Sequence, residues 1–232
     1  MAEYDEAIRR DPDHAKAHGN RGNACEGRGD YAGAIAEYTR VLEINPKDVK
    51  AHLNRAIAQF RLQRYDAAAA DYSEALRLNP KNGKAYCSRG MAWTKLGQTD
   101  KAMADYDEAI RLEPGHAEAW VCRAIARSAR GRRDEALTDL DEAVRLDPRS
   151  AKAWYQRGLL HAQMGHLDRA IGDFTEAVRL SPSDAYAYCH RGIAQTRKGD
   201  LAAAVSDYPE AIQHDPAYAS AYYNRGLVHT VQ

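Results

Sequence analysis

Seven of the eight prolines of this chain are equally spaced, and this spacing constrains the fold more than any other feature. They recur every 34 residues, as Pro12, Pro46, Pro80, Pro114, Pro148, Pro182 and Pro216. A fixed period of roughly 20 to 50 residues indicates a repeat architecture, in which each unit packs mainly on its neighbours. With proline as position 32, the chain divides into residues 1–14, then 15–48, 49–82, 83–116, 117–150, 151–184 and 185–218, then 219–232.

Each full unit predicts two helices, because its apolar residues recur every three or four positions. We expect helix A over about positions 2–14 and helix B over about positions 18–31. Residues 1–14 then form a half-repeat with helix B alone, and residues 219–232 a half-repeat with helix A alone. Side chains suited to N-capping precede both helix types. For helix B they are Asp30, Thr99 and Asp200, and for helix A they are Asp48, Asn82, Ser150 and Asp184.

The units also match one another position by position. Position 4 is aromatic or His, position 8 is Gly or Ala, position 20 is Ala, position 24 is large, and position 27 is Ala except at Val41. This pattern resembles the tetratricopeptide repeat family and covers the whole chain. The resemblance implies an all-α fold, a single right-handed α-solenoid (superhelix) of stacked antiparallel helix pairs over residues 1–232.

The main departure from the family pattern is at position 7, where Leu is usual and this chain has Arg in all seven copies, from Arg21 to Arg225. Position 23 is always acidic, from Glu3 to Asp207. We hypothesise that each of these arginines pairs with a position-23 carboxylate on a neighbouring helix B, with its stem along apolar surface. At position 8, Gly costs about 1 kcal/mol in helix propensity, so we expect it to allow close packing against Ala at position 20.

Pro209 is the one proline outside the series, at position 25 of the last helix B. Proline in a helix interior removes one backbone hydrogen bond and clashes with the preceding turn, at a cost of about 3 kcal/mol. The sequence therefore predicts a kink or an early break near Val205–Pro209.

The family resemblance implies that helix A lines a concave groove through positions 2, 5, 6, 9, 12 and 13. Candidate groove residues follow at three kinds of position. Cations stand at positions 2 and 13, namely Lys16, Lys50, Lys84, Lys152, Arg61, Lys95 and Arg197. Position 9 is apolar at Ile57, Met91, Ile125, Leu159 and Ile193, and polar at Asn23. Position 6 offers hydrogen-bonding side chains at Asn20, Asn54, Ser88, Cys122, Gln156 and His190.

This groove chemistry favours a protein–protein interaction scaffold that binds an extended peptide with acidic groups or a free C-terminal carboxylate. The alternative is that the lysines are ordinary solvated residues. In some family members position 6 forms an asparagine ladder, and this chain keeps only part of one. The carboxylate clamp of heat-shock co-chaperones is also incomplete: Asn23, Asn54 and Lys84 match it, whereas Gly19 and Ser88 replace its other two basic residues.

Composition argues against several other classes. Lys plus Arg and Asp plus Glu are equal at 33 each, so the chain lacks the charge of a nucleic-acid binder. No apolar run is long enough for a membrane span, and the first residues lack the apolar segment of a signal peptide. Cys25, Cys87, Cys122 and Cys189 follow no metal or disulfide spacing, which favours free thiols and a cytoplasmic location. We find no catalytic motif, so we expect no enzyme activity, cofactor or metal.

The half-repeats at the two ends leave two alternatives open. The chain is either a segment of a longer repeat protein, or its ends complement each other between molecules and stack head to tail. Two further functions stay open accordingly. One is structural self-assembly through the half-repeats, and the other is a recruiting arm of a larger enzyme or complex.

Overall fold

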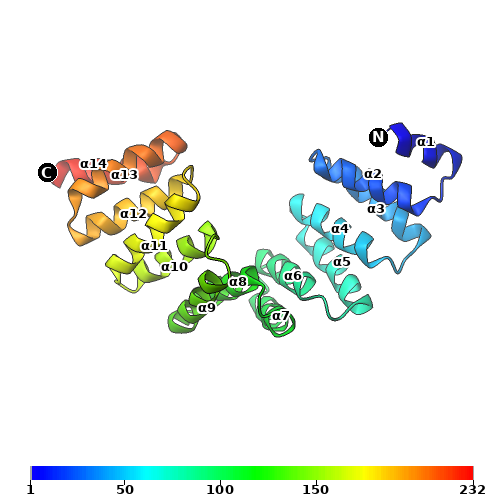
Figure 1. The fold of residues 1–232 in the computed structure, drawn as a ribbon, viewed down its shortest axis with the longest axis horizontal. Helices are drawn as coiled ribbons and strands as arrows, with labels where there is room; N and C mark the ends of the chain where they lie inside the picture. Colours follow the sequence, from blue (N-terminus) through cyan, green and yellow to red (C-terminus); the bar gives the residue numbers. More distant parts are fainter. Residues whose placement is uncertain (1, 232) are drawn as a thin grey trace. The chain divides into compact units, whose positions relative to one another are not determined.

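The structure, a computed structural model, describes residues 2–231 and all their side chains except those of His229 and Val231. Across these residues the fold is all-α, with fourteen helices and no strand, and consecutive helices pack side by side from the first helix to the seventh and again from the ninth to the fourteenth (Figure 1). The predicted α-solenoid of stacked helix pairs is confirmed. The helices gather into two compact units, an N-terminal unit ending at Cys122 and a C-terminal unit starting at Arg123. The 34-residue period continues through this division, which falls within one helix.

The helices alternate between the two predicted types. The first seven are α1 (Ala2–Arg10), α2 (Ala15–Gly27), α3 (Tyr31–Ile44), α4 (Val49–Arg61), α5 (Tyr65–Leu78), α6 (Gly83–Lys95) and α7 (Thr99–Leu112). Helix α8 (Ala117–Ala129) crosses the division between the units. The remaining six are α9 (Arg133–Leu146), α10 (Ala151–Gln163), α11 (Leu167–Leu180), α12 (Ala185–Lys198), α13 (Leu201–His214) and α14 (Ala219–Val231). Even-numbered helices are therefore the A helices of the repeat, and odd-numbered helices are the B helices.

Side-chain caps explain where several of these helices begin. The predicted caps accept hydrogen bonds from backbone amides three residues on, as the Asp30 carboxylate does from Gly33 N. The others that do so are Asp48, Asn82, Ser150, Asp184 and Asp200. The prediction for Thr99 is wrong, because α7 already begins at Thr99 and the preceding Gln98 makes no capping bond.

The turn from helix A to helix B depends on one left-handed residue at position 15. Five repeats have Gly there, with φ between 71° and 91°, as in Gly97 and Gly199. Glycine adopts this conformation without the steric cost that a Cβ brings. The repeat 49–82 has Gln63 instead, which is held at φ 60°. Its backbone is therefore strained where the other repeats are relaxed.

The core of each repeat forms around the large side chain at position 24. A Cβ added to Gly22 would lie 2.7 Å from Tyr38 Cε1, and one added to Gly90 would lie 2.6 Å from Tyr106 Cε1. Position 8 thus lies directly against the position-24 ring, in the same cluster as Ala at position 20. The small residue that interrupts the helical pattern makes room for an aromatic ring, and burial of that ring offsets the propensity cost.

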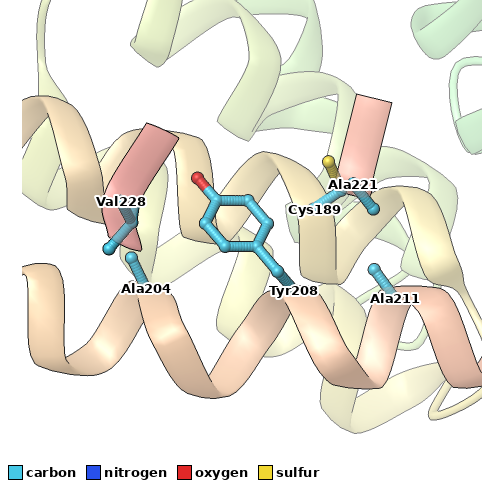
Figure 2. Close-up of a cluster of buried hydrophobic side chains, with 6 residues drawn as sticks. All are labelled: Cys189, Ala204, Tyr208, Ala211, Ala221 and Val228. Atoms are coloured by element: carbon cyan, nitrogen blue, oxygen red, sulfur yellow. The ribbon is translucent and has the colours of Figure 1, made fainter. Parts of the chain in front are cut away.

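Of the predicted kink or early break near Val205–Pro209, the early break is wrong, because α13 continues through Pro209 and has the same length as α11. Figure 2 shows the buried Tyr208 ring from this helix among Ala204, Val228 and Cys189. The packing of Tyr208, the residue before Pro209, therefore stabilises α13 at the proline. Pro209 itself is exposed, so water can replace the backbone bond that it removes.

Candidate functional site

The position-7 arginines of the six complete repeats, Arg21 to Arg191, form a ladder of ion pairs between helix A and helix B. Each one binds the position-23 carboxylate of helix B in its own repeat, with N–O distances between 2.6 and 2.8 Å. The pairs are Arg21–Glu37, Arg55–Asp71, Arg89–Asp105, Arg123–Asp139, Arg157–Asp173 and Arg191–Asp207. The hypothesised pairing is confirmed. The hydrogen bonds that Arg89 donates to the Asp105 carboxylate raise the pKa of Arg89, as expected for a cation held by its partner.

The same guanidinium groups also reach the preceding helix B at position 25. Arg55 Nη1 donates to Thr39 Oγ1 at 3.1 Å, and Arg89 Nη1 donates to Ser73 Oγ at 3.1 Å. Arg55 and Arg89 therefore each join their own repeat to the one before it, which a leucine at position 7 cannot do by hydrogen bonding. With position 7 turned toward the B helices, the predicted groove positions of helix A are left on the opposite side of the helix.

In the N-terminal unit this free side of α2 and α4 forms a cavity of about 420 Å³. Five predicted groove residues line it, namely Lys16, Asn20 and Asn23 from α2 and Lys50 and Asn54 from α4. Tyr38 and Val41 of α3 also contribute to the lining. The cavity exists because position 5 of α2 is Gly19, whose added Cβ would meet only Val41 Cγ2, at 3.9 Å.

Hydrogen bonds fix part of the amide groups in this cavity and leave the rest available. The Oδ1 atom of Asn23 accepts from the Tyr38 hydroxyl at 2.8 Å and from Asn54 Nδ2 at 3.1 Å. The Tyr38 hydroxyl lies 3.0 Å from Glu26 Oε2, and burial raises the pKa of Tyr38. Asn23 therefore keeps its NH₂ group, and Asn54 its carbonyl oxygen, for a ligand.

The predicted groove residues of the N-terminal unit, within the cavity and outside it, include several cations. Lys16, Lys50, Lys84, Arg61 and Lys95 form no ion pair with any residue in the part of the chain that the structure describes. Asp48 is the single carboxylate among the residues that line the cavity, and it caps α4 by accepting from Ala51 N at 3.0 Å. Within the described residues, these cations are thus not neutralised by an ion pair.

The remaining predicted residues of the N-terminal unit lie outside this cavity. Arg61, Lys84 and Lys95 are exposed, as is Ile57, whereas Ser88 and Met91 are half-buried. Cys122 is a poor candidate, because it is only 7% exposed. All four cysteines are buried and none forms a disulfide in the described part of the chain, in agreement with the predicted thiols.

The predicted groove residues of the C-terminal unit line two smaller cavities. Ile125, Gln156 and Leu159 contribute to one of about 50 Å³. Leu159, His190, Ile193 and Arg197 contribute to one of about 240 Å³, together with the Phe174 ring. Lys152 is exposed on the same helix as Leu159. Here the lining is mainly apolar, in contrast to the lysines and asparagines of the N-terminal cavity.

Sequence reasoning missed a group of tyrosines on the C-terminal unit. Tyr186 and Tyr218 have ring centroids 4.7 Å apart, and Tyr155 has its ring 5.6 Å from that of His190. Tyr155 and Tyr186 stand at positions 5 and 2, which the family resemblance already assigns to the groove. Reading these positions for aromatic residues as well as for cations would have identified them.

A further cavity, of about 530 Å³, was also missed. Its lining comes from α9, α10 and α11 and includes Trp154, Arg157, His161, Arg169 and Asp173. Burial lowers the pKa of His161, and its Nε2 atom is 3.9 Å from Asp173 Oδ2, beyond hydrogen-bond distance. In the preceding repeat Arg127 takes the same position and donates to Asp139 Oδ2 at 2.8 Å. His161 thus lines this cavity where the preceding repeat has an arginine that reaches the position-23 carboxylate.

Models of the tetratricopeptide repeat match most of the chain, over residues 22–63, 49–82, 83–116, 123–185 and 196–230. No curated protein matches it. In the part of the chain that the structure describes, no helix combines the length and apolar character needed to cross a membrane.

Solved structures share the fold at low sequence identity. The chain is similar to a subunit of the APC/C hetero-tetramer Cut9–Hcn1, with a TM-score of 0.84 and 17% identity over 98% of this chain and 45% of that one. It spans less than half the length of that protein. A tetratricopeptide repeat protein from Parabacteroides merdae has a TM-score of 0.75 and 23% identity over 97% of this chain and 90% of that one. YrrB, described as a protein with an unusual peptide-binding site, has a TM-score of 0.63 and 23% identity over 82% of this chain and 97% of that one.

Proposed function

The chain belongs to the tetratricopeptide repeat family, whose fold is a scaffold for protein–protein interaction, and we propose that its N-terminal unit binds an extended peptide segment with acidic groups. The observation that carries this proposal is the cavity between α2 and α4, where unpaired lysines stand beside partly free asparagine amides. Its volume of about 420 Å³ suits one or two side chains of a peptide.

The acidic preference follows from the charge distribution. The whole chain has no net charge, yet Lys16 and Lys50 both line the cavity and neither has an acidic partner among the described residues. Their field attracts carboxylates and raises the association rate. Screening by salt weakens it, because these side chains are exposed.

The preference for an extended backbone follows from the asparagines. A peptide in an extended conformation has unpaired N–H and C=O groups, which need partners once water is displaced. Asn20 is exposed, the Asn23 NH₂ group donates, and the Asn54 carbonyl accepts. The likeness to YrrB, itself described as peptide-binding, supports the same use of the fold.

The test is the affinity of the full chain for a fluorescein-labelled peptide rich in Glu, measured by fluorescence polarisation. Lys50→Glu is expected to weaken binding about tenfold or more, since it replaces attraction by repulsion in the cavity. The matched control is Lys47→Glu, an exposed lysine in the turn between α3 and α4. Equal losses for the two variants, or affinity that is insensitive to salt, would contradict the proposal.

Self-association is a second candidate, favoured by the apolar surface of α14. Tyr222, Tyr223 and Leu227 of this helix are all exposed large hydrophobic residues. Packing of this surface on the α1 end of another copy would join molecules head to tail. Light scattering across a concentration series is expected to show growth that Leu227→Glu abolishes. A mass that stays monomeric at high concentration excludes this candidate.

A further inference from the structure

The tyrosines of the C-terminal unit occupy the same repeat positions as the N-terminal cavity. Position 5 is Gly19 in α2 and Tyr155 in α10, and position 2 of the following A helix is Lys50 in α4 and Tyr186 in α12. Position 6 of that helix changes from Asn54 to His190. The chain therefore replaces a cationic cavity by aromatic side chains at equivalent positions.

These side chains form one connected surface, which we call the tyrosine cluster and define as Tyr155, Tyr186, Tyr218 and His190. The rings of Tyr186 and Tyr218 are tilted by 48° at 4.7 Å, and those of Tyr155 and His190 meet edge to face. His190 Nδ1 lies 2.9 Å from the Tyr186 carbonyl and 3.3 Å from the Tyr155 hydroxyl. Hydrogen bonds and ring contacts thus hold the cluster in place.

The cluster is accessible although it is held in place. Tyr186 is 52% exposed, whereas Tyr155, Tyr218 and His190 are half-buried. Tyr223, which stands outside the cluster at position 5 of α14, is 68% exposed. Burial raises the pKa of Tyr155 to about 12, so its hydroxyl keeps its proton at physiological pH. The surface therefore combines aromatic faces with phenolic O–H donors.

We propose that the tyrosine cluster binds a proline-rich segment in the polyproline II conformation. Such a segment has unpaired carbonyl groups, and its prolines have no N–H, so a surface that binds it needs donors and apolar faces. Tyrosine supplies both, and aromatic-lined grooves are an established way to bind this conformation. An acidic peptide needs cations, and no member of the cluster is Lys or Arg.

The spacing of the helices supports this choice of ligand. The A helices α10, α12 and α14 contact one another in sequence, and packed helices lie about 8–10 Å apart. A polyproline II helix advances about 3.1 Å per residue with three residues per turn, or about 9 Å per turn. Successive turns of one ligand would then meet Tyr155, Tyr186 and Tyr223 on successive A helices.

The experiment measures binding of a labelled oligoproline peptide to the full chain, with the labelled Glu-rich peptide in parallel. Tyr186→Ser is expected to weaken oligoproline binding about tenfold or more, as for a central aromatic contact, and Tyr186→Phe is expected to weaken it less. Tyr223→Ser is a second variant at a more exposed residue. The matched control is Tyr222→Ser, an exposed tyrosine at position 4 that lies 5.4 Å below the Arg225 guanidinium.

Several outcomes overturn this proposal. They are an oligoproline peptide that does not bind the unmodified chain, equal losses for Tyr186→Ser and Tyr222→Ser, or loss of Glu-rich peptide binding in Tyr186→Ser. The proposal concerns a second site and does not depend on the N-terminal cavity. Lys50→Glu changes binding of the Glu-rich peptide alone, so failure of one proposal is distinguishable from failure of the other.

Discussion

The helices α2 and α4 of the N-terminal unit and α10 and α12 of the C-terminal unit share one internal frame and present different surfaces. Both pairs have Arg at position 7, held by a carboxylate of helix B, and both pack a large ring at position 24. On their free sides, Gly19 and Lys50 correspond to Tyr155 and Tyr186. Positions 7, 8, 23 and 24 are thus common to both units, while positions 2, 5 and 6 differ between them.

The largest expected effect is on stability, and it tests whether the pairs between the position-7 arginine and the position-23 carboxylate stabilise both units. Asp105→Ala and Asp173→Ala each leave an arginine without its buried partner, since both carboxylates are 5% exposed. Each is expected to lower the free energy of unfolding by about 3 kcal/mol. Urea denaturation of the full chain measures this. The exposed pair Glu74–Arg77 is the control, and Glu74→Ala is expected to cost well under 1 kcal/mol. A large loss in one unit alone would break the comparison.

The next effect tests whether position 5 decides the difference between the two surfaces. Gly19→Tyr places in α2 the side chain that Tyr155 has in α10, and it is expected to fill the cavity. Affinity for the Glu-rich peptide should fall about thirtyfold, or about 2 kcal/mol. Gly19→Ala is the control, because its Cβ meets only Val41, at ordinary contact distance. Unchanged affinity in Gly19→Tyr would show that the cavity is not where the peptide binds.

A smaller effect concerns the turn at position 15, which is Gln63 in the N-terminal unit and Gly165 in the C-terminal unit. Gln63→Gly is expected to stabilise the chain by about 1 kcal/mol, because it removes the strain of a Cβ at positive φ. Thermal unfolding should show a higher midpoint. The reverse substitution, Gly165→Gln, should lower it, and a fall for Gln63→Gly would contradict this explanation.

The smallest effect is a pH dependence confined to the C-terminal unit. Burial lowers the pKa of His161 below its ordinary value of about 6.5, so the unfolded chain binds this proton more readily than the folded one. Stability is therefore complete above about pH 6.5 and falls as the pH decreases below it. His161→Gln, which copies Gln195 at the same repeat position, should flatten the pH profile of the unfolding midpoint. An unchanged slope would contradict the assignment to His161.

The sequence was sufficient for the features that repeat. The 34-residue period predicts every helix pair, and the coincidence of Arg at position 7 with an acid at position 23 predicts the ladder, because one contact recurs in six copies. Features that occur once were harder. Helix α13 continues through Pro209 because the neighbouring Tyr208 is packed in a buried cluster. Helix propensities of single residues do not reveal this tertiary packing. Burial of Cys122 and the cavity that His161 lines likewise depend on side chains from other helices.

The sequence predicted which residues line the candidate site better than it predicted the shape of the cavity. Lys16, Asn20, Asn23, Lys50 and Asn54 were identified from their repeat positions, and the structure brings them to one cavity. Neither the space above Gly19 nor the contact between Tyr186 and Tyr218 follows from spacing alone. Both depend on the distance between adjacent A helices, which packing of the whole repeat sets.

The central claim is that an acidic peptide binds between α2 and α4, and amide NMR of the full chain with the Glu-rich peptide tests it most directly. The predicted result is a set of saturable shifts in the side-chain amides of Asn20, Asn23 and Asn54, which disappear in Gly19→Tyr. Shifts confined to α10 and α12, with these three asparagines unchanged at saturation, would contradict it.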